Sequence, residues 1–191
     1  IPGNSTSLAF ATQGAHQRGR RDHGAMLWRL QLRGIDVGAR WSVVARNWEA
    51  VGGAGSYAFN DMHAMMAFVG AGSHKAGEAV LDAQRAALES AGDNAQFTRE
   101  VGFSATLAIK AFGDGRYAET VRLLRPIRNR AHRFGGSHAQ RDLIDLTLIV
   151  AASRAGQNRL ATALLAERAG AARNVPAAPR KAMAAKLVEA A

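Results

Sequence analysis

Apolar side chains recur along most of the chain at the three- and four-residue spacing of an α-helix. The clearest case is a run of four residues that occupy positions i, i+3, i+4 and i+7 of one helical face: Met62, Met65, Met66 and Val69. Because methionine commonly fills irregular gaps in protein cores, we expect this face to be buried. The alternation of apolar and polar residues that marks β-strands is nearly absent, so the sequence predicts an all-α fold.

Glycines divide the helical pattern into four units of similar length. An apolar residue stands four positions before each aligned glycine, and a small residue stands five positions after it. These glycines are Gly34, Gly72, Gly113 and Gly156, separated by 38, 41 and 43 residues. A glycine ends a helix easily because it adopts the left-handed conformation at little cost. Paired helices at this period are typical of an α-solenoid, so we expect stacked helix-turn-helix repeats; a helical bundle with coincident turns is the alternative.

The predicted organisation is one helical repeat domain, 21–170, with a short segment on either side. Its paired helices are expected over 21–50, 56–91, 95–132 and 138–169. Pro126 should kink or unwind the helix that contains it. Residues 1–20 are polar and are expected to be irregular or divergent. Residues 171–191 contain two prolines and are expected to form a loop followed by a short C-terminal helix.

Polar residues occur early in the first helix of three predicted units. Ser137 and Gln140 have the spacing of a capping box, which marks one of these helix starts. Equivalent positions of stacked repeats lie near one another, so we expect six polar side chains to converge on one concave surface: Asp61, His63, Glu100, His138, Arg141 and Asp142. A hydrogen-bond network that only fixes the repeats, or an ordinary solvated helix face, would leave the same pattern.

Several classes of chemistry have no support in the sequence. The chain has no cysteine, which excludes disulfides and thiolate metal sites and fits a reducing compartment such as the cytoplasm. It has no pair of histidines at metal-ligand spacing, no nucleophile elbow and no phosphate-binding loop. We therefore expect no catalytic residue, no metal and no cofactor. No apolar run is long enough to span a membrane, and the start at Ile1 suggests a fragment or a processed chain.

The net charge of +10 comes mostly from arginine, which supplies 21 of the 25 basic residues. Such a charge would favour nucleic acid or anionic surfaces. The arginines are spread over the chain, however, so we expect a basic surface and no dedicated nucleic-acid site. Three tryptophans cluster in the first unit and are expected in the core: Trp28, Trp41 and Trp48.

Four stretches of the chain resemble the C-terminal part of the tetratricopeptide repeat protein 38 family. They are Met26 to Leu30 with Gly34 and Arg40-Trp41, Tyr57 to Phe68, Thr98 to Gly102, and His132 to Asp142 with its Gly-Gly-Ser-His-Ala-Gln-Arg-Asp block. The resemblance covers about 22–170, and residues 1–20 and 170–191 depart from it. It implies tetratricopeptide-like repeats in a bacterial cytoplasmic protein of greater length, and it implies no known reaction.

These observations favour a non-catalytic scaffold that binds a protein or peptide on its concave face. The residues expected to contact the partner are the six polar residues named above, with Arg141 pairing to a carboxylate. An enzyme or a small-molecule-binding protein that uses the same cluster is the alternative. A solenoid that is open at one end would expose apolar surface, which a homo-oligomer would cover.

Overall fold

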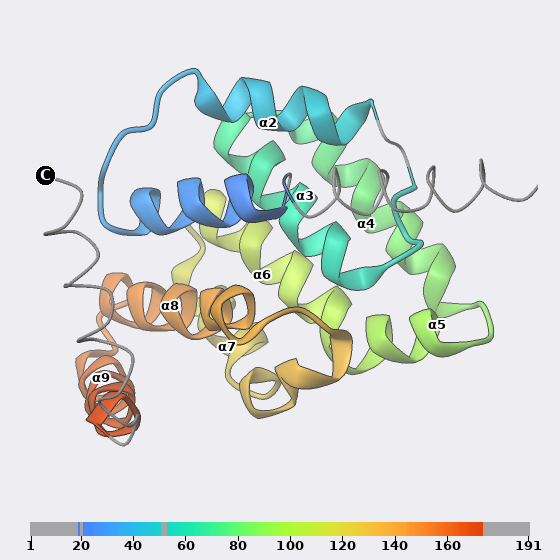
Figure 1. Cartoon of the computed structure of the whole chain (residues 1–191). Helices are drawn as coiled ribbons and strands as arrows, with labels where there is room; N and C mark the ends of the chain where they lie inside the picture. Colours follow the sequence, from blue (N-terminus) through green and yellow to red (C-terminus); the bar gives the residue numbers. More distant parts are fainter. Residues whose placement is uncertain (1–18, 20, 51–52, 174–191) are drawn as a thin grey trace, which may run out of the picture.

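The computed structural model describes residues 19, 21–50 and 53–173, and this part of the chain contains helices and no strand. The all-α prediction is therefore confirmed for these residues. A helix over 21–32, blue and unlabelled in Figure 1, comes first. The labelled elements follow in the order α2 (Arg40–Glu49), α3 (Ala58–Ala71), α4 (His74–Leu88), α5 (Asp93–Phe97), the π-helical turn η1 (Thr98–Gly102), α6 (Phe103–Gly113), α7 (Tyr117–Leu124), the 3₁₀ segment η2 (Arg128–Phe134), α8 (His138–Arg154) and α9 (Asn158–Arg173).

The ends of the chain can be compared with the predictions only in part. The irregular segment expected over 1–20 and the terminal helix expected within 171–191 lie outside the described residues, apart from residue 19 and the end of α9. Because α9 continues to Arg173, residues 171–173 are helical, where a loop was expected. Pro126 follows the end of α7 and precedes the 3₁₀ segment, so the predicted local unwinding is confirmed.

Four turns between helices share one hydrogen-bond pattern around a left-handed glycine. In each turn, the N–H after the glycine donates to the carbonyl four residues before the glycine, at 2.8–3.0 Å. The four glycines have φ between 69° and 77°, and they are Gly34, Gly72, Gly115 and Gly156. The predicted alignment was wrong by two residues at the third turn, where it used Gly113. Gly113 instead ends α6, where a Cβ would lie 2.3 Å from Val69.

The first unit departs from the other three. Its second helix, α2, begins six residues after the turn glycine, whereas α4, α7 and α9 begin two residues after theirs. The intervening residues form a second turn, in which Gly38 N–H donates to the Asp36 carboxylate at 2.8 Å. The insertion shifts the helical register, so the aligned Val43 is 51% exposed and Val44 is buried in its place.

Helix α3 is the centre of the molecule, packed against α2, α4 and α6. Its three methionines are at most 1% exposed, which confirms the predicted core face. Residues without a Cβ let the neighbouring helices approach closely: a Cβ on Gly102 would lie 2.4 Å from the Ala58 side chain. Consequently residues 58–68 are buried on every side except at Asn60, and the polar residues of this stretch are buried with them.

The helix over 21–32 lies across α3, α6 and α8 (Figure 1). The Trp28 indole N–H donates to the Thr147 hydroxyl on α8 at 2.9 Å, and its ring packs against Phe112 on α6 at 5.5 Å. Arg21 donates to the Asn60 side chain on α3 at 3.3 Å. In a linear solenoid each repeat contacts only its neighbours. Here the first helix also contacts α8, which belongs to the last helix pair. It therefore lies on the surface of α3, α6 and α8 that we expected to be open to a partner.

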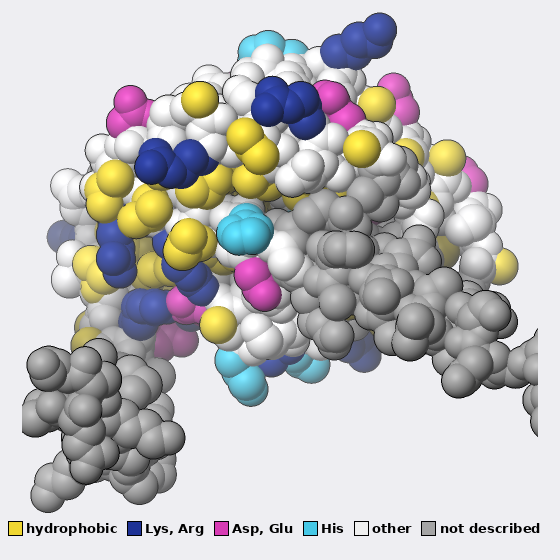
Figure 2. Space-filling view, turned by 45° about the horizontal axis from the view of Figure 1, so that its top comes forward, with side chains coloured by type: hydrophobic (Ala, Val, Ile, Leu, Met, Phe, Trp, Pro, Cys, Tyr) yellow, Lys and Arg dark blue, Asp and Glu magenta, His cyan; other side chains and the backbone are white. Residues whose placement is uncertain are grey.

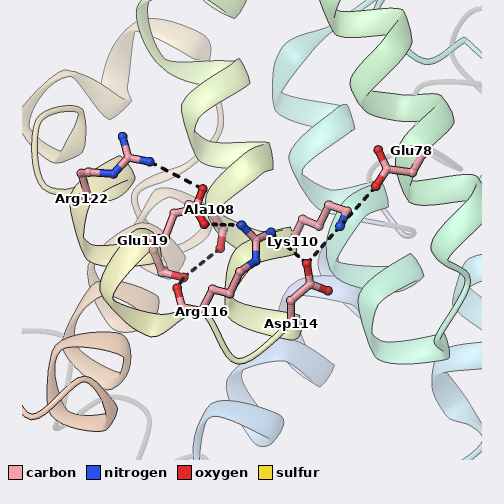
Figure 3. Close-up of polar contacts among 8 residues, drawn as sticks. Glu78, Ala108, Lys110, Asp114, Arg116, Glu119 and Arg122 are labelled. Carbon is pink, nitrogen blue, oxygen red and sulfur yellow. Dashed lines mark hydrogen bonds and ion pairs between the residues drawn. The ribbon is translucent and has the colours of Figure 1, made fainter.

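Ion pairs connect α4, α6 and α7 along another part of the surface (Figure 3). The Lys110 ammonium lies 3.2 Å from Glu78 of α4 and 3.0 Å from Asp114. Arg116 then pairs with Asp114 at 2.9 Å and with Glu119 of α7. Exposed pairs of this kind each contribute little, at most about 1 kcal/mol, so the network fixes geometry more than it adds stability.

Candidate functional site

The six polar residues predicted to form one surface lie in four separate environments. No hydrogen bond or ion pair joins any two of them in the part of the chain that the structure describes. Asp61 and His63 are both buried on α3, but each has its own hydrogen-bond partners. Glu100 lies on η1, and the other three lie in the first turns of α8: His138, Arg141 and Asp142.

Asp61 is a buried carboxylate that holds the loop before α3. One oxygen accepts from the Gly55 N–H at 3.0 Å and the other from the Gln84 side-chain amide at 3.1 Å. Burial raises the pKa of Asp61 to about 6, although both hydrogen bonds oppose the shift. Asn94 on α5 holds the same loop by donating to the Gly55 carbonyl at 2.6 Å. Asp61 also lines a cavity between α2, α3 and α4.

His63 has no contact with solvent, so it cannot meet a partner on the surface. Its Nδ1–H donates to the Phe59 carbonyl at 2.9 Å, and its ring packs 4.5 Å from the Phe59 ring. Burial lowers the pKa of His63 to about 4, which keeps the imidazole neutral near pH 7. Its second nitrogen, Nε2, has no hydrogen-bond partner among the described residues. The helix over 21–32 passes nearby, with Gly24 beside the His63 carbonyl.

Glu100 joins two irregular elements instead of contributing to an inner surface. Its carboxylate accepts from Gln96 at 3.0 Å and from Arg133 of η2 at 2.7 Å. The hydrogen bond from Gln96 and the charge of Arg133 lower the pKa of Glu100. The pair thus bridges η1 and η2, and its carboxylate is already neutralised by a cation of the same chain.

The start of α8 is built on a pair of glycines that pack against α3. Gly135 and Gly136 have φ of 94° and 81°, and a Cβ on Gly136 would lie 2.2 Å from the Phe59 ring. The predicted capping box follows and is confirmed: the Gln140 N–H donates to Ser137 Oγ at 3.3 Å, and the Ser137 N–H donates to the Gln140 side chain at 3.1 Å. The glycines therefore serve close packing, and the cap satisfies the first backbone N–H groups.

A groove of about 600 Å³ lies beside this helix start. We call it the α8 groove. Its charged and imidazole side chains come from η2, α8 and α9: Arg128, His132, His138, Arg141, Asp142, Asp145 and Arg168. Two of its arginines are neutralised, because Arg128 binds Asp145 at 2.9 Å and Arg168 binds both oxygens of Asp142. Arg141 instead donates to the Gly136 carbonyl and has no carboxylate partner among the described residues.

The arginines of the segment after α6 do not form a bare stripe that would track phosphates. Arg116 pairs with two carboxylates, Arg128 with two and Arg133 with one. On the face drawn in Figure 2, basic side chains are scattered among hydrophobic and acidic ones. Part of the positive charge of this segment is therefore neutralised within the chain.

The described residues provide neither a metal site nor a membrane-spanning helix. Among residues 19, 21–50 and 53–173, no group of three or more His, Asp or Glu side chains is placed to hold a metal ion. No helix in those same ranges is long and apolar enough to cross a bilayer. The Asp142 carboxylate is held by Arg168 and lies 3.7 Å from Arg29.

No protein-family model matches the chain, and no solved structure matches it. The site must therefore be interpreted from its own geometry.

The sequence did not reveal the arginines that neutralise the carboxylates of the α8 groove, nor the residues that line the Asp61 cavity. Arg168 and Arg128 occupy the carboxylates of the α8 groove, and they come from α9 and η2. Nothing in the local sequence pairs Arg168 with Asp142, 26 residues earlier. Trp48 and Glu49 line the Asp61 cavity. The feature of the sequence that could have pointed to this cavity is the glycine-rich linker that follows them.

Proposed function

We propose that the protein is a non-catalytic helical-repeat scaffold that binds a protein or peptide partner, with the α8 groove as its contact surface. Arg141 carries this proposal: it is the groove arginine whose charge no carboxylate of the described chain neutralises. A guanidinium without a carboxylate partner can bind one by donating two parallel hydrogen bonds to its oxygens. The partner is therefore one that presents an acidic side chain or a terminal carboxylate.

The rest of the groove supports a binding role. His138 is exposed beside Arg141, while Arg128 and Arg168 are fixed by their own ion pairs and form a rigid wall. A rigid polar rim around a single unpaired cation favours one orientation of an acidic ligand over others. The tetratricopeptide-like arrangement, the cytoplasmic location and the bacterial origin implied by the resemblance belong to the same proposal.

The structure changes where the predicted contacts would lie. His63 is too deeply buried to touch a partner, Asp61 does not line the α8 groove, and Glu100 and Asp142 are occupied by arginines of the chain. Of the six predicted residues, His138 and Arg141 remain as partner contacts. The proposed contact surface is therefore smaller than a concave face that binds through all six predicted residues.

Replacement of Arg141 by alanine tests this function. We expect Arg141→Ala to weaken partner binding by about 10- to 100-fold, since a charge-assisted hydrogen bond contributes about 1.5 to 3 kcal/mol. The matched control is Arg122→Ala, because Arg122 is exposed on α7 and lies 3.6 Å from Glu119. The partner is first captured from the source organism's lysate and then purified, and its affinity is measured by calorimetry.

Three outcomes are informative. Loss of binding in Arg141→Ala with retained helical content and retained binding in Arg122→Ala supports the α8 groove. Equal affinity of all three proteins contradicts it. An Arg141→Ala variant that unfolds would show that the bond to the Gly136 carbonyl is structural, and the exposed variant His138→Ala then decides whether the groove binds.

A further inference from the structure

The cavity between α2, α3 and α4 differs in charge from the rest of the protein. It has a volume of about 490 Å³, within the range of small-molecule sites. The ionisable groups that line it, among the described residues, are Glu49, Tyr57 and Asp61. No lysine, arginine or histidine of those residues lines it, although the whole chain has a net charge of +10.

Aromatic rings and aliphatic side chains form the remaining walls. Trp48 from α2 and Phe68 from α3 are buried at this surface, and Tyr57 lies at the start of α3. The cavity is open to solvent at an exposed rim that includes Glu49, Ala54 and Ala79. A pocket with apolar and aromatic walls and two carboxylates suits a cation with an apolar stem, because the rings attract positive charge and the stem replaces water.

Asp61 has no cationic partner among the residues that the structure describes. Its two hydrogen bonds come from the uncharged Gly55 N–H and Gln84 amide, and the buried Gln84 amide oxygen has no hydrogen-bond partner in the described ranges. The charged group that shares the cavity with it, Glu49, is also acidic. A buried carboxylate normally requires a positive partner, so the fold leaves room for one to be supplied from outside.

We propose that this cavity binds an organic ammonium ion with an alkyl stem, with Asp61 and Glu49 as counter-ions and Trp48 as an apolar wall. The ammonium group belongs either to a lysine side chain of another polypeptide or to a free alkylamine. Both present the same chemistry to the cavity. This site is independent of the α8 groove, which is formed by η2, α8 and α9.

The test compares a cation with its neutral counterpart on the whole chain. Pentylammonium chloride and 1-pentanol are titrated at pH 8 while the indole N–H resonance of Trp48 is followed by NMR, with Trp48→Phe used for assignment. We expect saturable binding of pentylammonium that is about tenfold tighter than that of pentanol. In Asp61→Asn this preference should fall to about twofold or less, because the charge is lost while an oxygen remains for Gly55.

Controls separate the carboxylate from general effects of charge. Asp82→Asn removes an exposed carboxylate on α4 that pairs with Arg85 and does not line the cavity, so it should keep the full preference. Glu49→Gln at the exposed rim cannot unfold the core and should reduce the preference by about two- to threefold. Glu49→Gln therefore decides the question if Asp61→Asn does not fold.

A second pair of probes distinguishes the source of the ammonium group. The peptide acetyl-Gly-Lys-Gly-amide is compared with its norleucine analogue under the same conditions. Preference for the lysine peptide assigns the site to a polypeptide partner, and binding of pentylammonium alone assigns it to a free amine. Equal binding of pentanol and pentylammonium, an unchanged preference in Asp61→Asn, or no saturable shift with either probe overturns the proposal.

Discussion

At the scale of single residues, two buried ionisable groups on α3 have opposite effects on stability. His63 is neutral in the fold, with its pKa lowered to about 4, so protonation favours the unfolded chain as the pH falls below 6.5. Asp61 has its pKa raised to about 6, so the folded chain holds its proton longer, and stability is lost as the pH rises from about 4 through 6. Between pH 4 and 6 the two contributions largely cancel.

Asp61→Asn should expose the contribution of His63. We expect the free energy of unfolding of the variant to rise by about 1 kcal/mol per pH unit from pH 4 to 6, while that of the wild type stays nearly flat. Above pH 6.5 the variant should be more stable than the wild type by about 1 to 3 kcal/mol. The Gln84 amide can rotate and offer its unpartnered oxygen to the new asparagine.

Urea unfolding at a series of pH values measures both quantities. Asp82→Asn is the control, because Asp82 is exposed on α4, and its curve should run parallel to that of the wild type. Parallel curves for the wild type and Asp61→Asn between pH 4 and 6 would refute the opposed contributions.

At the scale of helices, the sequence predicted where helices form and failed to predict how they are surrounded. The spacing of the methionines identified α3 because helical periodicity is a local property. The same pattern could not show that α2, α4 and α6 enclose α3, since the close approaches depend on glycines such as Gly70 against Trp41 and Gly113 against Val69, which add nothing to an apolar periodicity. Asp61 and His63 were therefore assigned to an accessible surface, and Gly113 was aligned as a turn although it packs on Val69.

The glycines at the start of α8 and at its end should differ in their tolerance of a side chain. Gly136→Ala places a Cβ 2.2 Å from the Phe59 ring in a left-handed conformation, and we expect a loss of about 3 to 5 kcal/mol. Gly156→Ala has the same backbone conformation with open space around it, so the loss should be about 1 to 2 kcal/mol. Denaturant unfolding of the two variants provides the comparison, and equal losses would show that the contact with Phe59 is relieved by movement of the loop.

At the scale of the whole molecule, the helix over 21–32 joins the first and last helix pairs. Its contacts with α8 include the bond from Trp28 to Thr147, the bond from Arg29 to the Ala139 carbonyl and the bond from Gln140 to Asp22 at 2.9 Å. The tryptophans were correctly predicted to lie in the core. Their partners could not be predicted, because no local pattern identifies which of several buried threonines accepts the Trp28 indole N–H.

Thr147→Val should weaken both ends of the molecule together. The variant keeps the shape of the side chain and leaves the Trp28 indole N–H without an acceptor, which costs about 1 to 3 kcal/mol. Native-state hydrogen exchange should show an equal loss of protection in α8 and in the helix over 21–32. Thr106→Val is the matched control, because the Thr106 hydroxyl is buried on α6 with no hydrogen-bond partner among the described residues, so its removal should be neutral or slightly stabilising. A loss confined to α8 would mean that the two ends unfold separately.

The reach of the helix over 21–32 also has a consequence for biosynthesis. Trp28 precedes Thr147 by 119 residues, so at about 5 to 20 residues per second the ribosome needs roughly 6 to 24 s to make the acceptor after the donor. During that interval the helix has emerged, but the α6 and α8 surfaces that bury its indole ring are still incomplete. The first described helix of the chain is therefore among the last to reach its final place, since 119 residues are added between the Trp28 donor and its Thr147 acceptor.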